Sequence, residues 1–476
     1  MERPAFHDAA RAWTHAEVHD GGHRAAAFLL GSGVRPGDRV LLVARDRVEL
    51  VWALLGAARV GATAVLVNPL LPELDHDFML RDSSPTLVVC EPLLRERFAA
   101  TAPTLVVDDL SEMEPGTFPG PEVDLDTPAY AQYTSGTTGM PRAALHRHTD
   151  PACYYRAMGA PVLMLQPEDV VLSVSKAYFA YGLGNTVFFP LFSGCSAVLD
   201  ADKPTVDRVE SLTTRHGVTV LFAVPSFYAG LVSRGDARCF ASVRLAISAG
   251  EALQPTLYHR ARSWLGREIV DGLGSTEVGQ TFISNTPGRS RPASIGSVLP
   301  GYEALVCDES GRALPPEQSG ALWVRGDSVM IGYLNRPDAT AAAVVDGWCR
   351  TGDRVSADRD GYFYHHGRLD DIEVVGGNNV SPLEVEAVLL EHPAVVEVAV
   401  AAVLDQTGAS RLQGFAVVNA DVGAPLDLES QLLALARARL APFKVPRSVT
   451  VVDALPRTAT GKLRRHVLRA GWPDPK

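Results

Sequence analysis

The fold assignment of this chain turns on one stretch, Tyr133-Thr134-Ser135-Gly136-Thr137-Thr138-Gly139-Met140-Pro141-Arg142. It follows an apolar run and gathers two glycines, four Ser or Thr hydroxyls and one basic residue within ten positions. A loop of this composition can surround phosphate oxygens with backbone N–H groups and hydroxyls, while the cation supplies charge. It lacks the G-x-x-x-x-G-K-[ST] spacing of a Walker A loop. Because such clusters are also typical of surface linkers, the segment alone leaves both interpretations open.

Short β-rich runs bounded by turn residues recur on both sides of this loop. They lie at residues 40–44, 64–67, 86–90, 104–107, 170–174, 218–224, 245–247 and 268–270. Stretches with helical periodicity, such as 48–60 and 206–216, separate several of them. Continuously apolar strands that alternate with helices predict an α/β fold with parallel sheets.

The pattern changes twice towards the C-terminus. From about residue 296 to 363, short strands and Gly/Asp turns predict a small antiparallel barrel or sandwich. We expect a domain boundary near residues 368–371, because the α+β pattern that follows is long enough for an independent domain. In that part, Ser381-Pro382-Leu383-Glu384 predicts a helix start with Ser381 as the N-cap, and places Leu383, Ala387 and Leu390 on one face.

Composition limits the classes of function. The 476 residues are 46% hydrophobic and 21% charged, which is typical of globular proteins rather than of disordered or collagen-like chains. A net charge of −11 argues against non-specific nucleic-acid binding. Six scattered cysteines indicate neither a disulfide framework nor a zinc site. With no secretory signal and no membrane-spanning stretch in view, we expect a cytoplasmic protein without nucleic-acid or membrane partners.

Taken together, the motifs resemble the adenylate-forming superfamily, which includes acyl- and aryl-CoA ligases, luciferases and the adenylation domains of peptide synthetases. They follow in the family's order: the loop at 134–142, then 248–252, 271–277, 347–353, 367–371 with 376–382, and 455–462. The resemblance implies an α/β protein in which residues 1–369 form an N-terminal adenylation core of two α/β layered subdomains plus a small β-barrel. Residues 370–476 would form a smaller, mobile α+β lid with its hinge at Asp370.

The resemblance also implies an ATP site. Attack of a carboxylate on the α-phosphate of ATP, with pyrophosphate leaving, requires negative charges to be gathered and neutralised. The implied ATP-binding residues are Thr134, Ser135, Gly136, Thr137, Thr138, Gly139, Arg142, Ser248, Ala249, Gly250, Glu251, Asp271, Gly272, Asp353 and Arg368. Of these, Asp271 would meet the adenine amino group, and Asp353 would chelate the ribose hydroxyls with Arg368 nearby.

Three residues are the implied catalytic groups. Thr276 would contact the α-phosphate region, and Glu277 would hold Mg²⁺ as the metal ligand. Lys462 would bridge the carboxylate and the α-phosphate with a compact ammonium group. Only five of the 44 basic residues are lysine, so the lysine kept in Thr-Gly-Lys is harder to dismiss as a solvated tail residue. Gly376 and Gly377 would line the thiol channel, where a bare backbone lets the tether approach.

The segment 176–185 resembles the benzoate–CoA ligase branch, as do residues 224–228 and 283–285. The implied substrate-binding residues are Phe179, Ala180, Tyr181, Gly184, Gly274, Gly279 and Gln280. Aromatic walls suit an aryl ring, although the same aromatics also fit core packing. Gly279 and Gln280 differ from the residues of benzoate ligases, which hints at a hydroxyl or amino substituent on the ring.

We therefore expect ATP-dependent activation of a substituted benzoate-like acid as acyl-AMP, followed by transfer to coenzyme A (CoA). The enzyme would be an AMP-forming acid–thiol ligase that uses ATP, Mg²⁺ and CoA. The alternative is a stand-alone adenylating enzyme that hands the adenylate to a carrier protein, an amine or an inorganic nucleophile. A nucleotide-binding protein without turnover is a third interpretation, which intact Glu277, Asp353 and Lys462 disfavour. Two residues depart from the family pattern: Arg142 replaces the usual lysine, and Glu373 lies near the hinge. The sequence leaves open whether the protein forms a homodimer.

Overall fold

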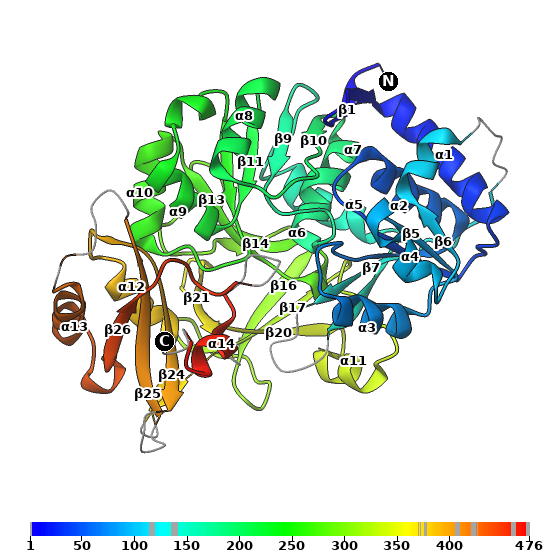
Figure 1. The fold of residues 1–476 in the computed structure, drawn as a ribbon. Coiled ribbons are helices and arrows are strands. Elements are labelled where there is room, and N and C mark those ends of the chain that lie inside the picture. The colour runs from blue at the N-terminus through cyan, green and yellow to red at the C-terminus, as the bar shows by residue number, and fades with distance from the viewer. Residues whose placement is uncertain are drawn as a thin grey trace.

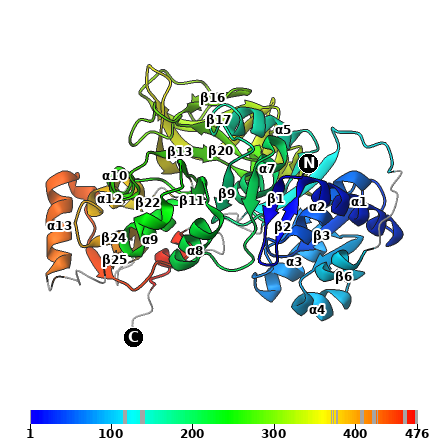
Figure 2. The same cartoon turned by 90° about the horizontal axis from the view of Figure 1, so that it is seen from above.

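The chain builds two layered α/β units, an antiparallel sheet and a smaller C-terminal unit, as this computed structural model shows (Figure 1). The structure describes residues 2–113, 120–134, 141–369, 371, 373–375, 378–404, 410–419, 425, 427–457 and 463–472. Seen from above, the C-terminal unit and the first α/β unit lie at opposite ends of the molecule (Figure 2). The nine-stranded sheet lies between them, so residues from all units can meet around its edge.

The first unit is a seven-stranded sheet in the order β18-β8-β7-β4-β3-β5-β6. Its strands are β3 (Arg39–Val43), β4 (Thr63–Leu66), β5 (Leu87–Cys90), β6 (Thr104–Val106), β7 (Pro128–Thr134), β8 (Arg142–Arg147) and β18 (Gly332–Tyr333). Helices α1 (His15–Gly31), α2 (Val48–Val60) and α3 (Glu73–Ser83) belong to this unit. Strands β3 to β7 pair in parallel and are mostly buried, which confirms the predicted α/β layering.

The second unit is a nine-stranded sheet in the order β15-β14-β13-β12-β11-β9-β10-β1-β2. Its strands are β1 (Pro4–His7), β2 (Ala12–Thr14), β9 (Val170–Ser173), β10 (Ser196–Val198), β11 (Val220–Ala223), β12 (Leu245–Ser248), β13 (Ile269–Gly274), β14 (Thr281–Ser284) and β15 (Ser297–Val298). Its helices include α8 (Val206–His216), α9 (Pro225–Arg234) and α10 (Pro255–Leu265). Strands β11, β12 and β13 run parallel, so their carboxyl ends meet at one edge.

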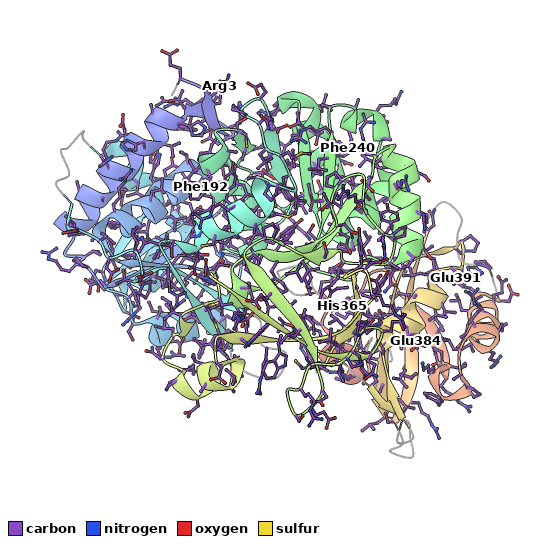
Figure 3. The ribbon with its side chains drawn as sticks, turned by 180° about the vertical axis from the view of Figure 1, so that it is seen from behind. Arg3, Phe192, Phe240, His365, Glu384 and Glu391 are labelled. Carbon is purple, nitrogen blue, oxygen red and sulfur yellow. The ribbon has the colours of Figure 1, made fainter. Side chains whose placement is uncertain are left out.

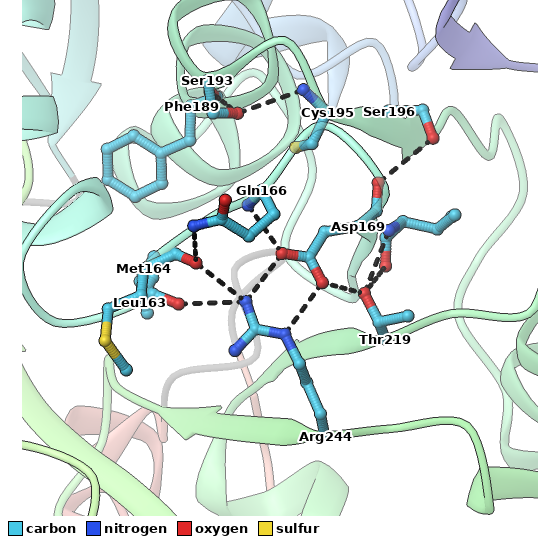
Figure 4. A network of polar contacts seen from close by, with 11 residues as sticks. Leu163, Met164, Gln166, Asp169, Phe189, Ser193, Cys195, Ser196, Thr219 and Arg244 are labelled. Atoms are coloured by element: carbon cyan, nitrogen blue, oxygen red, sulfur yellow. Dashed lines mark hydrogen bonds and ion pairs between the residues drawn. The ribbon is translucent and has the colours of Figure 1, made fainter.

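A polar network anchors the loop that enters this sheet (Figure 4). The carboxylate of Asp169 accepts hydrogen bonds from Arg244 Nη2 at 2.7 Å and from Thr219 Oγ1 at 2.7 Å. Arg244 also donates to the carbonyl oxygens of Leu163 and Met164. Burial alone would raise the pKa of Asp169, but these donors hold it below its usual range.

The predicted antiparallel region is confirmed. It consists of β16 (Tyr302–Cys307), β17 (Ser319–Gly326), β19 (Val344–Val345), β20 (Trp348–Ala357) and β21 (Phe363–Arg368), with helix α11 (Pro337–Ala343) beside it. The C-terminal unit contains β22 (Glu373–Val375), β23 (Asn378–Val380), α12 (Pro382–Leu389), β24 (Val395–Leu404), β25 (Ser410–Val418), α13 (Leu428–Arg439), β26 (Ser448–Val451) and α14 (Arg465–Arg469).

Helix α12 begins where the sequence predicts, but two details differ. The Ser381 hydroxyl does not cap the helix and instead donates to the carbonyl oxygen of His366 at 2.8 Å. The fully buried apolar side chains are Val385, Val388 and Leu389, whereas Leu383 is only half-buried. Leu383, Ala387 and Leu390 share one face of the helix but are only half-buried, because α12 packs against β24 and α13 mainly through its opposite side.

Candidate active site

Two predicted adenine-site residues lie side by side at the carboxyl edge of the nine-stranded sheet. Ser248 ends β12 and pairs in register with Asp271 of β13. Both are buried, and neither Ser248 Oγ nor Asp271 Oδ1 makes a hydrogen bond of ordinary geometry within the described part of the chain, although the Ser248 hydroxyl lies near the Asp271 carboxyl. Burial raises the pKa of Asp271 well above its usual range. Such unsatisfied buried groups at the ends of parallel strands fit a ligand that supplies the missing donors and acceptors.

The turn after β12 brings the backbone close to this edge. Ala249 is buried, and Gly250 has a φ of +91°, a conformation that favours glycine. On the neighbouring strand, a Cβ on Gly272 would lie 2.9 Å from the carbonyl oxygen of Ile283. Both glycines therefore have a backbone reason for their identity, as expected for a wall along which a flat base lies.

Glu251 joins this wall to the C-terminal unit. Its carboxylate accepts hydrogen bonds from the backbone N–H and the hydroxyl of Ser226, and Arg457 Nη1 lies 2.7 Å from Oε1. Arg457 Nη2 in turn pairs with Glu397 of β24 at 2.7 Å. Burial raises the pKa of Glu251, and the charge of Arg457 opposes that rise. One arginine thus bridges a carboxylate of the core and a carboxylate of the C-terminal unit.

Residues 276–278 form a short turn whose carbonyl groups are held from outside. The backbone N–H of Met330 donates to the Glu277 carbonyl oxygen at 2.8 Å. The hydroxyl of Ser328 donates to the Val278 carbonyl oxygen at 2.7 Å. Gly279 follows with a φ of +86°, and its Cβ would come within 3.3 Å of Tyr154. These contacts hold the backbone of the turn and thereby set the direction of the Glu277 Cα–Cβ bond.

Tyr333 connects this turn to the strand that leaves the phosphate loop. Its hydroxyl donates to Glu277 Oε1 at 2.8 Å, and its ring centroid lies 5.6 Å from the guanidinium carbon of Arg142. Burial and the charge of Glu277 raise the pKa of Tyr333. Arg142 starts β8 opposite the half-buried Thr134, and it lines an open pocket of about 380 Å³ together with residues 335–339. Tyr333 was not predicted as a site residue, because it stands in no chemistry-bearing motif of the sequence.

Asp353 and Arg368 face each other across β20 and β21, as the ribose interpretation requires. A third residue joins them: His365 Nε2 lies 3.1 Å from Asp353 Oδ1, while Arg368 Nη1 lies 3.5 Å from the same oxygen. Burial would raise the pKa of Asp353, but His365 and Arg368 hold it below its usual range. Figure 3 places His365 on the antiparallel sheet beside the C-terminal unit. His365 was not predicted as a site residue. Its position two residues before the motif at 367–371 was the available indication that it lies near Arg368.

The predicted aryl segment also meets the turn after β13. Phe179, Ala180 and Tyr181 are half-buried at the start of a short helix, and Gly184 follows on it. Gln280 Nε2 donates to the Tyr181 carbonyl oxygen at 3.3 Å and to Asn185 Oδ1 at 3.3 Å.

Gln280 also explains two glycines near this segment. A Cβ on Gly184 would lie 2.2 Å from Gln280 Nε2, and a Cβ on Gly274 would lie 2.8 Å from the Gln280 carbonyl oxygen. The hydroxyl of Tyr181 and the amide nitrogen of Asn185 are buried without a hydrogen-bond partner among the described residues. The structure thus gathers apolar rings and unsatisfied polar atoms around one buried glutamine.

Several predicted residues lie outside the described part of the chain. They are Ser135, Gly136, Thr137, Thr138, Gly139, Asp370, Gly376, Gly377 and Lys462. Their neighbours are described: Glu373 is buried and pairs with Arg469 Nε at 2.8 Å, and Arg465 pairs with Glu386 at 2.6 Å. The departure at Glu373 therefore has a structural partner on α14.

Glu277 fits Mg²⁺ as a single protein carboxylate. In the described ranges, no three His, Cys, Asp or Glu side chains are grouped as a metal site would need. Mg²⁺ is commonly held by one or two carboxylates together with substrate phosphates and water, so a preformed cage is not required. No helix in the described residues combines the length and the apolar character needed to cross a membrane.

Known proteins share this organisation. A family model described as AMP-binding enzyme matches residues 1–334, and one described as AMP-binding enzyme C-terminal domain matches residues 384–462. The p-hydroxybenzoic acid–AMP ligase FadD22 of Mycobacterium tuberculosis is 44% identical over 480 residues, which cover 99% of this chain and 67% of that protein. The benzoate–CoA ligase of Thauera aromatica is 36% identical over 92% of this chain and 86% of its own length.

A solved structure agrees with these relatives. The anthranilate CoA ligase AuaEII in complex with anthranoyl-AMP superimposes with a TM-score of 0.93 at 31% identity, covering 98% of this chain and 94% of that one. The resemblance found in the sequence is therefore confirmed over both parts of the chain. The chain belongs to the AMP-binding enzymes of the adenylate-forming superfamily, close to the benzoate–CoA ligase branch, and is an AMP-forming acid–thiol ligase.

Proposed function

We propose that this enzyme activates a hydroxybenzoate-class acid with ATP and then transfers the acyl group to CoA. The observation that carries the choice of acid is the buried polar end of the aryl segment. Tyr181 Oη and Asn185 Nδ2 make no hydrogen bond of ordinary geometry within the described residues, although the Asn185 side chain lies near the phenol, and both lie on the segment that Gln280 holds. A hydroxyl on the ring would satisfy such groups, whereas unsubstituted benzoate would leave them unpaired at a cost of about 1–3 kcal/mol.

The first step joins the carboxylate oxygen of the acid to the α-phosphorus of ATP. The bond from that phosphorus to the bridging oxygen breaks, and pyrophosphate leaves with the electron pair. Mg²⁺, when bound, neutralises phosphate charge, and Glu277 is the carboxylate that would hold it. Arg142 and Lys462 would supply the remaining positive charge. Asp271 would accept from the adenine amino group, and Asp353 would accept from the ribose hydroxyls.

In the second step, the CoA thiolate attacks the acyl carbonyl carbon and AMP leaves, which yields a thioester. The names of several relatives support this acceptor, including the benzoate–CoA ligase and the 4-hydroxybenzoate–CoA/benzoate–CoA ligase of Rhodopseudomonas palustris. A second candidate function ends at the adenylate, which passes to a carrier protein, an amine or an inorganic nucleophile. It is favoured by the name of the relative at 44% identity, an AMP ligase.

Two measurements test the proposal. Exchange of labelled pyrophosphate into ATP should depend on the acid, and 4-hydroxybenzoate should support at least about tenfold higher kcat/KM than benzoate. Equal values for the two acids would refute the assignment of a polar substituent. Mass spectrometry of the products, with and without CoA, separates the two acceptors: an acyl-CoA thioester supports the first candidate, and an adenylate that persists with CoA supports the second.

A further inference from the structure

Strand β8 carries a buried histidine that lies beneath the turn of Thr276 and Glu277. The side chain of His146 is fully buried. Its Nε2 atom lies 2.7 Å from the Thr276 carbonyl oxygen, and its Nδ1 atom lies 2.9 Å from Asp150 Oδ2. The ring stacks on Tyr130 with centroids 5.0 Å apart and an interplanar angle of 17°. The imidazole is thus fixed by contacts on both nitrogens and on one face.

The two hydrogen bonds define where the protons are. A backbone carbonyl oxygen only accepts, so Nε2 must carry a proton. Asp150 Oδ2 also accepts from the backbone N–H of Arg147 at 3.1 Å. The pair is therefore either an imidazolium with a carboxylate, or a neutral imidazole with a protonated Asp150 that donates to Nδ1. In both forms Nε2–H points at Thr276.

We propose that His146, oriented by Asp150, is a positioning residue for adenylation. It fixes the Thr276 carbonyl and thereby the direction of Glu277, and this role rests on the proposed function. The Thr276 carbonyl also accepts from Gly279 N at 3.2 Å, which closes the turn from within. His146 adds a contact from outside the turn, on the strand that begins at Arg142. The phosphate-loop strand and the Mg²⁺ carboxylate are therefore held in one geometry.

Asp150→Asn separates this role from simple packing. The atom that faces Nδ1 must remain an oxygen, because it accepts from Arg147 N, so the amide oxygen of the asparagine takes that place. Neutral His146 then donates from Nδ1, and its Nε2 lone pair faces the Thr276 carbonyl, which is repulsive. Protonation of His146 restores the Nε2 donor. Activity of this variant should therefore recover as the pH falls, a change that lost packing would not produce.

The other titratable or charged groups around the imidazole do not provide the same switch. Tyr130 stacks on it, and Tyr154 lies behind Tyr130 with the two hydroxyl oxygens 3.4 Å apart. Burial raises the pKa of both phenols, so both stay neutral over the working range of pH. The guanidinium of Arg147 lies 3.8 Å from Asp150 Oδ1, on the side of the carboxyl group away from the imidazole contact.

The experiment compares wild type, His146→Leu, Asp150→Asn and the control His76→Leu. His76 is equally buried, and its Nε2 lies 2.9 Å from the Asn68 carbonyl oxygen, away from the turn. Acid-dependent pyrophosphate exchange should fall about tenfold in kcat/KM for MgATP in His146→Leu, with the KM for the aryl acid within about twofold. The control should change neither value by more than about twofold, even if its Tm falls.

Nuclear magnetic resonance of protein labelled with ¹⁵N-histidine gives a readout that needs no turnover. The wild type should show a protonated Nε2 at His146, assigned from the signal missing in His146→Leu, and Asp150→Asn should show a protonated Nδ1 with a free Nε2 at neutral pH. An unchanged tautomer in Asp150→Asn, or equal kinetic losses in His146→Leu and His76→Leu, would overturn the positioning role. If the wild type showed no pyrophosphate exchange with any aryl acid, the proposed function would be refuted instead. The tautomer of His146 would still be measured independently of that result.

Discussion

The bridge made by Arg457 predicts how strongly the C-terminal unit is held against the core. Its two nitrogens each lie 2.7 Å from a carboxylate oxygen, one of Glu251 in the core and one of Glu397 in the same unit as Arg457. Of these two ion pairs, the one with Glu251 crosses between the units. Replacing Arg457 by glutamine removes both arms, whereas Glu397→Gln removes the internal arm alone and is the matched control.

The magnitude follows from the burial of the partners. The exposed side-chain fractions are 26% for Arg457 and 18% for Glu251, so the crossing pair is largely shielded from solvent. A hydrogen bond to a charged group contributes about 1.5–3 kcal/mol, and about 2 kcal/mol shifts the balance of docked and undocked orientations about 30-fold. The loss also leaves Glu251 buried near Glu397, whose charge raises the pKa of Glu251.

Hydrogen exchange followed by mass spectrometry measures this balance. Helix α9 packs against β24 at the same contact, so amides of 225–234 should exchange faster in Arg457→Gln and stay near wild type in Glu397→Gln. Pyrophosphate exchange should fall with the docked population, because Arg457 contacts Glu251, one of the proposed ATP-binding residues. Equal exchange in the two variants, with equal activity, would refute the idea that Arg457 holds the units together.

Three further predictions concern single buried groups. Burial raises the pKa of Asp46 to about 6, so the ionised carboxylate lowers the free energy of unfolding as the pH rises through that value. In urea unfolding, Asp46→Asn should have the same free energy of unfolding as wild type near pH 4, and a free energy up to about 3 kcal/mol higher at pH 8. Asp169 has a lowered pKa because its carboxylate is hydrogen-bonded, so Asp169→Asn should lower the free energy of unfolding by about 2 kcal/mol at pH 7. The difference between variant and wild type should shrink below about pH 4, where the Asp169 carboxylate of the wild type becomes protonated. Gly184→Ala should raise the KM for the aryl acid about tenfold while leaving that for ATP unchanged in pyrophosphate exchange, because the new methyl would displace the amide of Gln280.

Much of the fold could be predicted because its strands carry their own signal. The runs at 40–44, 86–90 and 245–247 are apolar on both faces, and each is a buried parallel strand in the structure. The helix expected at 206–216 is α8 with the same bounds. Which side of α12 is buried could not be predicted, because that helix is apolar on more than one side and its neighbours decide which side packs.

The candidate site was predictable where its residues belong to one motif, and less so where they meet from distant segments. Asp271 and Ser248 come from separate motifs, but parallel pairing of adjacent strands brings them together. Tyr333 and His146 stand 56 and 130 residues from their partners in the turn. Spacing along the sequence cannot predict such pairs, because their hydrogen bonds form only when the two sheets pack against each other.

Gly279 shows that a residue implied by the resemblance can also have a purely structural reason. The resemblance implies that Gly279, like its neighbour Gln280, is a substrate-binding residue. Its φ of +86° and the nearness of Tyr154 nevertheless give the backbone a sufficient reason for glycine, whatever acid is bound. The case for a polar substituent therefore depends on Gln280 and the unsatisfied atoms of Tyr181 and Asn185. Substitutions at Gln280 should accordingly change the choice among aryl acids, whereas those at Gly279 should disturb the turn for every acid alike.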